Sequence, residues 1–251
     1  MFRPRVIPVL LLKNNGLVKS IKFQSHNYIG DPINAVKIFN DLKADELVFL
    51  DINATKEKRL ISLDFVQKVG EEANMPFAVG GGIKCLEDIR KILKSGAEKV
   101  IICSEAINNP EFIKEASDNF GSSTISVCLD YKNSILRKSA LYTKSGLKKS
   151  KHSILSFSKI IQDKGAGEII LQSISRDGSM EGYDLEIIKE VSSHLDIPTV
   201  ALGGAGRIQD FKLAHRNSKA SALAAGSLFV YQSKLRGVLI NYPEKEELKA
   251  I

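Results

Sequence analysis

The chain has 251 residues, of which 43% are hydrophobic, and its formal net charge is +7. A chain of this length can bury a complete core as one domain, and no apolar run approaches the roughly 18 residues needed to cross a bilayer. Its basic residues are not interleaved with aromatic ones and tryptophan is absent. These features argue against nucleic-acid binding and leave either a solvated basic surface or attraction of acidic and phosphorylated small molecules.

The first strand is predicted over Arg5–Lys13, a nearly continuous apolar run with a charge at each end. Such runs are typical of parallel strands that are buried on both faces. Seven further strands follow, at intervals that leave room for a helix between each pair. They are predicted at 46–51, 76–79, 99–102, 124–130, 168–172, 198–202 and 222–225.

Helices are predicted between these strands. A turn at 14–16 and a short strand over Lys19–Phe23 precede the first helix, which Asp31 caps and Pro32 begins. The helical pattern recurs at 63–72, 86–94, 110–119, 154–164, 185–192 and 207–215, and a closing helical segment is predicted over Tyr231–Ile240. The basic stretch Lys132–Lys151 contains no acid and is expected to form an exposed hairpin or loop.

Eight strands that alternate with helices predict an α/β fold, a (βα)8 TIM barrel forming a single domain over residues 1–251. An open doubly wound sheet is the structural alternative. An internal repeat favours the barrel, because Glu46–Ala106 and Glu168–Val230 share an order of features. Each begins with Glu and an apolar strand, passes a proline-led strand into a glycine cluster, and ends in Ser plus apolar residues. Half-barrels of about 1–122 and 123–251 account for this repeat.

Cysteine usage and the N-terminal residues bear on the cellular compartment. Cys85, Cys103 and Cys128 are odd in number and lack metal-binding spacing. We therefore expect buried, reduced thiols and, because the N-terminus has no signal-peptide layout, a cytoplasmic protein. Neither a metal site nor a cofactor is predicted.

Two glycine clusters follow corresponding strands, Gly80–Gly82 after the third and Gly203–Gly206 after the seventh. Glycine lets backbone N–H groups approach a phosphate, and a following helix N-terminus adds a favourable partial charge. A plain tight turn explains one cluster, whereas two at corresponding positions favour a ligand with a phosphate at each end. The predicted phosphate-binding residues are Gly81, Gly82, Ser104, Asp177, Gly178, Gly203, Gly204, Gly226 and Ser227.

Several motifs together resemble the cyclase subunit of imidazole glycerol phosphate synthase, a half-barrel-repeat enzyme of histidine biosynthesis. The resemblance covers nearly the whole chain. It rests on Gly-Asp-Pro at 30–32, Ala-Asp-Glu-Leu-Val-Phe-Leu-Asp-Ile at 44–52, Val-Gly-Gly-Gly-Ile at 79–83, Arg-Asp-Gly at 176–178, Gly-Tyr-Asp-Leu at 182–185 and Gly-Gly-Ala-Gly at 203–206. It implies a heterodimer with a glutaminase subunit, whose ammonia enters the bottom of the barrel and travels to the top. There a substrate with two phosphates is cleaved and cyclised.

The resemblance also implies an entry gate of four charges at the bottom of the barrel, which this sequence matches at Arg5, Glu46, Lys99 and Glu168. Each of these residues begins a strand that is otherwise apolar. Two bases that face two acids would supply the partners that buried charges need. A salt-bridged plug that merely closes the barrel is the alternative interpretation.

The top of the barrel departs from the family pattern. The family has a catalytic Asp at the end of the first strand and another at the end of the fifth. Asp130 matches the second, but Leu11 stands in place of the first and cannot transfer a proton. Lys19 in the first loop is retained. Three further positions differ, since Cys103, Gln172 and Leu202 replace the usual Asn, Thr and Ser.

Because these losses gather at one end, the chain is similar to a paralogous branch associated with amidino modification of surface sugars. It shares Leu-Leu-Leu-Lys at 10–13 and Ala-Ala-Gly-Ser-Leu-Phe at 224–229 with that branch. The resemblance implies ammonia supply to a separate sugar amidotransferase, which converts an acetamido group on a nucleotide-linked sugar to acetamidino. We favour this hypothesis over a histidine-pathway cyclase with altered catalytic groups, and over a binding or regulatory barrel without chemistry.

Overall fold

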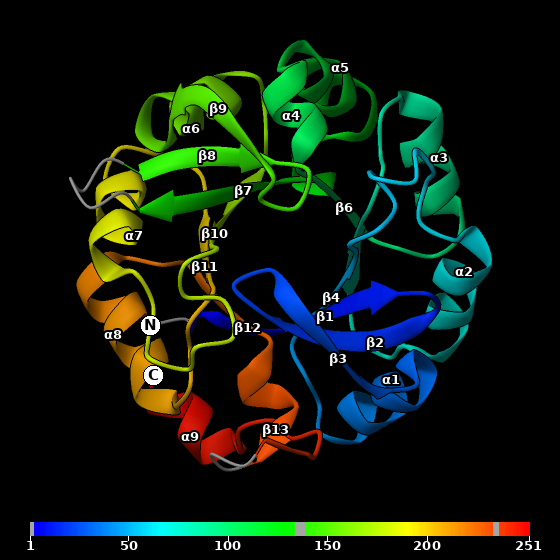
Figure 1. The fold of residues 1–251 in the computed structure, drawn as a ribbon, viewed down its shortest axis with the longest axis vertical. Helices are drawn as coiled ribbons and strands as arrows, with labels where there is room; N and C mark the ends of the chain where they lie inside the picture. Colours follow the sequence, from blue (N-terminus) through cyan, green and yellow to red (C-terminus); the bar gives the residue numbers. More distant parts are fainter. Residues whose placement is uncertain (1–2, 134–138, 233–235) are drawn as a thin grey trace.

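The computed structural model describes residues 3–133, 139–232 and 236–251, and it confirms the predicted closed barrel (Figure 1). Eight parallel strands form a ring, which the pairing of the last strand with the first closes. In ring order they are β1 (Arg5–Lys13), β4 (Leu47–Asp51), β5 (Phe77–Gly80), β6 (Lys99–Ile102), β7 (Ile125–Asn133), β10 (Glu168–Ser173), β11 (Thr199–Leu202) and β12 (Ala222–Ala225). The chain is therefore a (βα)8 TIM barrel.

Helices surround the strands on the outside of the barrel (Figure 1). The Asp31 cap is confirmed, since its side chain accepts a 2.9 Å hydrogen bond from the backbone N–H of Asn34. Ser62, which was not predicted as a cap, accepts one of 3.3 Å from the backbone N–H of Phe65. The helices are α1 (Pro32–Asp41), α2 (Leu63–Glu72), α3 (Leu86–Lys94), α4 (Ser104–Asn108), α5 (Glu111–Phe120), α6 (Ile154–Asp163), α7 (Leu185–Ser192), α8 (Ile208–Ser218) and α9 (Lys245–Lys249). In the described part of the chain, no helix combines the length and apolar character needed to cross a bilayer.

Alternation along each barrel strand divides the core in two. On β1, Val6 and Leu10 point outward and pack in the layer between strands and helices. Ile7 and Val9 point inward, into a smaller cluster that fills the barrel interior. The nearly continuous apolar run of β1 therefore serves both layers, as expected of a strand buried on both faces.

Two antiparallel hairpins lie across the end of the barrel where the parallel strands finish, which we call the top (Figure 1). The first consists of β2 (Gly16–Ile21) and β3 (Gln24–Gly30), so the predicted short strand over Lys19–Phe23 lies partly in β2 and partly in the turn. The second consists of β8 (Ser139–Thr143) and β9 (Lys148–Ser153). It confirms the hairpin expected for the basic stretch, of which residues 134–138 lie outside the described residues.

The closing helix predicted over Tyr231–Ile240 is wrong. After a 3-10 turn, η2 (Ser227–Phe229), the chain forms a small antiparallel pair of β13 (Tyr231–Gln232) and β14 (Gly237–Val238); residues 233–235 lie outside the described residues. Val238 and Leu239 are each 50% exposed, so they do not form the buried face of an amphipathic helix. The backbone N–H groups of Leu239 and Asn241 donate hydrogen bonds to the carbonyl oxygens of Val230 and Phe229, in place of helical hydrogen bonds.

Three further features differ from the predictions or were not foreseen. Cys85, expected to be buried, is exposed at the start of α3, because it occupies the N-cap position outside the core. Another 3-10 turn, η1 (Ser122–Thr124), leads into β7. The short helices α4 and α9 are each five residues long, too short for a periodic apolar pattern to reveal them.

Candidate functional site

The four charged residues predicted at the start of the strands meet at the bottom of the barrel. Arg5 contacts both acids, with Nη2 2.7 Å from Oε2 of Glu168 and Nη1 bonded to Oε2 of Glu46. Lys99 lies between the same two acids, with Nζ 3.2 Å from Oε1 of Glu46 and 3.6 Å from Oε1 of Glu168. These residues form a closed ring of alternating charge, which we call the charged ring.

The ring is stabilised by mutual pairing. Burial alone would raise the pKa of Glu168, but Lys99 and Arg5 outweigh it, and a 2.7 Å hydrogen bond from the Ser126 hydroxyl adds to their effect, so the pKa is held below its ordinary value. Burial alone would lower the pKa of Arg5, but the two carboxylates raise it above its ordinary value. For Arg5 and Glu168 the pairing thus favours the charged forms, as a hydrogen-bonded buried cluster requires.

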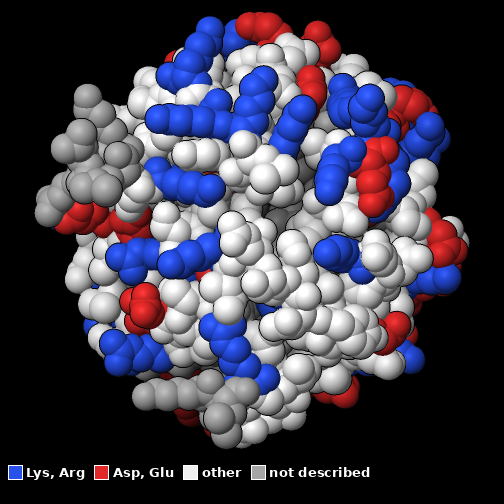
Figure 2. Space-filling model, viewed as in Figure 1, with Lys and Arg blue, Asp and Glu red and all other residues white. Residues whose placement is uncertain are grey.

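A cavity of about 640 Å³ occupies the top of the barrel, bounded by the loops that follow the strands and by both hairpins. Figure 2 shows Lys and Arg gathered around the hollow at the centre of this face. The lysines that line the cavity mouth come from the end of β1 and from several separate loops, and they are Lys13, Lys56, Lys58, Lys84 and Lys144. Such a concentration of positive charge attracts anionic ligands.

Both glycine clusters border this cavity, after β5 and β11, which lie on opposite sides of the ring of strands. Gly82 has φ +73°, and a Cβ there would lie 1.8 Å from the carbonyl oxygen of Arg59. A Cβ on Gly204, which has φ +111°, would lie 2.2 Å from the carbonyl oxygen of Gly182. Only glycine fits either turn, so bare backbone faces the cavity at both places. Gly81 and Gly203 line the cavity beside them.

The remaining predicted phosphate-binding residues also border the cavity. Ser104 follows β6, next to the first glycine cluster, and its hydroxyl oxygen accepts a 3.0 Å hydrogen bond from the backbone N–H of Lys144 in the second hairpin. Gly226 and Ser227 follow β12, next to the second cluster. Each glycine cluster is therefore adjacent to the serine-containing turn of the next barrel strand.

Asp177, in the loop after β10, is engaged by the first hairpin. Its Oδ2 accepts a 2.7 Å hydrogen bond from the Ser20 hydroxyl and one of 3.3 Å from the backbone N–H of Phe23. A Cβ on the adjacent Gly178 would lie 2.2 Å from the carbonyl oxygen of Ser20. Burial raises the pKa of Asp177, although these hydrogen bonds and Lys19 oppose the shift. These contacts hold the hairpin down over the cavity.

Lys19, predicted as a catalytic residue of the first loop, extends from β2 into the barrel. Its Nζ donates a hydrogen bond to the carbonyl oxygen of Val9, and the residue is only 4% exposed. Burial lowers the pKa of Lys19 to about 8, against a smaller opposing effect of Asp177. This amine can gain or lose a proton near physiological pH.

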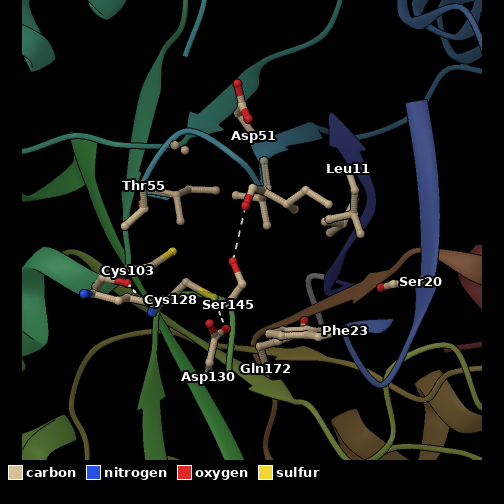
Figure 3. Close-up of a pocket in the computed structure, with 18 of the residues that line it drawn as sticks. Leu11, Ser20, Phe23, Asp51, Thr55, Cys103, Cys128, Asp130, Ser145 and Gln172 are labelled. Carbon is tan, nitrogen blue, oxygen red and sulfur yellow. Dashed lines mark hydrogen bonds between the residues drawn. The ribbon is translucent and has the colours of Figure 1, made fainter. Parts of the chain in front are cut away.

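Asp130 and Leu11 face the cavity from β7 and β1 (Figure 3). Burial raises the pKa of Asp130 to about 7, while a 3.7 Å hydrogen bond from Cys128 Sγ lowers it and Asp177 raises it further. Asp130 is therefore poised for proton transfer near neutrality. Leu11 packs against the interior apolar cluster, so β1 contributes a hydrocarbon side chain at the position where the family has a carboxylate.

The other departures from the family pattern lie around the same cavity. Cys103, Gln172 and Leu202 all line it, at the ends of β6, β10 and β11. Sequence reasoning missed Cys128, Phe23 and Ser145, which also line it (Figure 3). The alternation of β7 carried the signal for Cys128, because it lies two residues before Asp130. No local signal identified the other two, which come from hairpin turns.

Comparisons with known proteins agree with this architecture. The family model described as histidine biosynthesis protein matches residues 5–236. A Leptospira interrogans protein provisionally named imidazole glycerol phosphate synthase subunit HisF is 44% identical over 252 residues, covering 100% of this chain and 99% of that protein. A Vibrio vulnificus protein provisionally named subunit hisF3 of the same synthase is 43% identical over 250 residues, covering 99% and 96% of the two chains.

A third relative carries the same subunit name without reservation. The imidazole glycerol phosphate synthase subunit HisF of Alkaliphilus metalliredigens is 42% identical over 231 residues, covering 92% of both chains. These names agree with the family resemblance found in the motifs, and they favour histidine biosynthesis over the sugar-modifying branch. The chain belongs to the histidine biosynthesis protein family and is a homologue of the HisF subunits of imidazole glycerol phosphate synthase.

Proposed function

We propose that this chain is the synthase subunit of a glutamine amidotransferase, in which ammonia from a glutaminase enters through the charged ring and reacts in the top cavity. The observation that carries this proposal is the pair of glycine turns on opposite sides of one lysine-rimmed cavity. This arrangement fits a ligand with a phosphate at each end. The glutaminase would dock at the bottom, next to the charged ring, to form a heterodimer.

The barrel interior suits a small neutral molecule. Between the charged ring and the cavity, the inward side chains are apolar, and several are small, including Ala78, Ala222 and Ala224. An apolar passage favours ammonia over the ammonium ion, because a charge would lose its hydration there. The ring would then act as the gate at which ammonia enters.

The reaction that the relatives' names support is the one named for their synthase, imidazole glycerol phosphate formation in histidine biosynthesis. In this chain the two glycine turns would hold the two phosphates and the lysines at the mouth would attract them. Asp130 would exchange protons with the reacting atoms, as its pKa of about 7 allows. Lys19 would act from the first hairpin when the hairpin rearranges over a bound substrate.

Leu11 favours a second candidate function. With a hydrocarbon side chain across the cavity from Asp130, β1 supplies no proton donor or acceptor where the family reaction uses one. The second candidate is therefore a barrel that conducts ammonia without cyclising a substrate. It would deliver ammonia to a separate sugar amidotransferase that forms an acetamidino group on a nucleotide-linked sugar.

One experiment separates these candidates. The chain is purified with its candidate glutaminase, and product formation from the bis-phosphorylated histidine intermediate is measured with ammonium salt and with glutamine. Ammonium-dependent product supports the histidine reaction. Absence of product, together with binding of the glutaminase and glutamine hydrolysis that depends on the barrel, supports ammonia delivery. Absence of both would contradict the proposed function and leave a binding or regulatory barrel.

A further inference from the structure

Two cysteines lie on neighbouring strands at the floor of the top cavity. β6 and β7 are parallel neighbours in which Ile102 pairs with Val127, and Cys103 and Cys128 follow these two residues. The two thiols are in contact. Cys128 belongs to the interior apolar cluster and Cys103 packs against it, so both side chains are directed into the barrel. Figure 3 shows both residues on the same side of the cavity, next to Asp130.

This placement suits a disulfide. Neighbouring strands are about 4.8 Å apart, and disulfides join residues whose Cα atoms are roughly 4.4–6.8 Å apart. Cys103 lies just beyond the last residue of β6, at the N-cap of α4, so its backbone is not held by the strand ladder. The local chain can therefore adjust to the geometry of the bond.

The two thiols differ in accessibility. Cys103 is partly exposed to the cavity, whereas Cys128 is only 2% exposed and donates a hydrogen bond to Asp130. Contact with Cys103 and burial raise the pKa of the Cys128 thiol well above its ordinary value. A small oxidant that enters the cavity therefore meets Cys103 first, while Cys128 waits as a protonated thiol beside a carboxylate.

We propose that Cys103 and Cys128 form an oxidisable dithiol site, in which a peroxide oxidises Cys103 and Cys128 then closes a disulfide. In the first step Cys103 gives its proton to solvent, and its thiolate attacks one peroxide oxygen. The O–O bond breaks, Cys103 becomes a sulfenic acid, and the departing hydroxide takes up a proton to become water. In the second step Cys128 sulfur attacks the sulfenic sulfur, Asp130 accepts the Cys128 proton, and hydroxide departs and is protonated. The balance is two thiols and one hydrogen peroxide giving one disulfide and two waters.

The disulfide would act on Asp130, and its effect on activity rests on the proposed function. Oxidation removes the Cys128 S–H and with it a hydrogen bond that lowers the pKa of Asp130. Asp177 remains nearby and favours protonation of Asp130, while the Lys19 ammonium is held at Val9. We therefore expect the pKa of Asp130 to rise above about 7 on oxidation, which leaves less carboxylate at neutral pH.

The test is chemical and does not depend on activity. The full chain is treated with hydrogen peroxide, free thiols are alkylated, and peptides are mapped by mass spectrometry without reduction. We expect a Cys103–Cys128 cross-linked pair that has lost two hydrogens, with Cys85 still alkylated. Carbon-13 NMR of the aspartate carboxyl groups should then show Asp130 titrating at higher pH in the oxidised protein.

Matched variants keep the outcome clear. Cys103→Ser should abolish the cross-link, and Cys128→Ala should leave a sulfenic acid at Cys103 that dimedone traps. Cys85→Ser removes an exposed thiol outside the cavity and should leave the cross-link intact. Overoxidation of Cys103 without a cross-link, or cross-links only through Cys85 between two copies, would overturn the dithiol site. A cross-link with unchanged Asp130 titration would overturn its control of Asp130.

Discussion

Of the four strands that carry the charged ring, Arg5 lies on the first in the sequence and Glu168 on the last. Their side chains nevertheless meet, with Arg5 Nη2 2.7 Å from Glu168 Oε2. The same carboxylate accepts a hydrogen bond from Ser126 and lies 3.6 Å from Lys99. Three strands therefore hold Glu168 from different sides. Glu168 is therefore the residue of the charged ring through which contacts from β1, β6 and β7 converge.

Replacement of Arg5 by Ala tests the ring as a gate. We expect Arg5→Ala to uncouple glutamine hydrolysis from ammonia use, because the Glu46 and Glu168 carboxylates lose the guanidinium that joins them. The free energy of unfolding should fall by about 1–3 kcal/mol, since Lys99 still pairs with both acids. The measurement is the ratio of product formed to glutamine hydrolysed, with urea unfolding for stability.

Arg3→Ala provides the matched control for that variant. Arg3 pairs with Asp45 at 2.6 Å outside the charged ring. We expect this change to cost less than about 1 kcal/mol and to leave coupling intact. Unchanged coupling in Arg5→Ala would identify the ring as a structural plug.

Replacement of Leu11 by Asp tests whether position 11 alone accounts for the altered top. We expect Leu11→Asp to show no cyclase activity, because Cys103, Gln172 and Leu202 also differ around the same cavity. The new carboxylate would also face a largely apolar wall. Ammonium-dependent turnover of the bis-phosphorylated intermediate is the measurement. Strong activity in this single variant would show that Leu11 was the sole defect.

Asp130 should make stability depend on pH. Its pKa rises from 3.8 to about 7 on folding, so below about pH 4 both states are protonated. Between pH 4 and 7 the unfolded chain ionises first, and the fold loses stability as pH rises. Asp130→Asn removes this loss. The free energy of unfolding of the variant, relative to the parent, should therefore be about 1–3 kcal/mol higher at pH 8 than at pH 4, a range that allows for water in the cavity.

Urea unfolding at several pH values measures this effect. Asp163→Asn, changed at an exposed position of α6, is the control and should follow the pH dependence of the parent chain. A stability difference between Asp130→Asn and the parent that stays constant from pH 4 to 8 would contradict the buried-carboxylate interpretation.

Asp177 should determine how often the first hairpin opens. Asp177→Asn weakens the hydrogen bonds from Ser20 and Phe23, at a cost of about 1–2 kcal/mol to the closed state. Hydrogen exchange of the β2 amides should then become about tenfold faster. Asp31→Asn, at the cap of α1 next to the same hairpin, should leave these rates unchanged, since Asn caps as well as Asp. Equal rates in the parent and Asp177→Asn would show that other contacts hold the hairpin.

The sequence predicted the barrel well because buried parallel strands leave a strong local signal. The bounds of β1 and β6 are the ones predicted from their apolar runs and flanking charges. The segment 231–240 failed because its apolar residues suit a helix and a hairpin equally, and only contacts with the preceding turn decide between them. α4 and α9 are too short to carry a period.

The candidate site was predicted in part for similar reasons. A glycine that follows a strand and a charge that begins one can both be recognised from the sequence of that strand alone. Gly82, Gly204 and the charged ring were therefore predicted. The engagement of Asp177 by Ser20 joins residues 157 positions apart, and no local pattern encodes it. The proximity of Cys103 to Cys128 depends on β6 lying beside β7, which no local pattern encodes.

Lys19 has a consequence for ligand binding in the cavity. Its Nζ donates a hydrogen bond to the Val9 carbonyl oxygen, and a Cβ on Gly226 would lie 2.5 Å from the same nitrogen. One side chain from the first hairpin thus fills space next to the second glycine turn and beside β1, four residues above the charged ring at Arg5. A ligand group that settled against Gly226 would therefore meet the Lys19 amine, which ties the turn after β12 to the first hairpin.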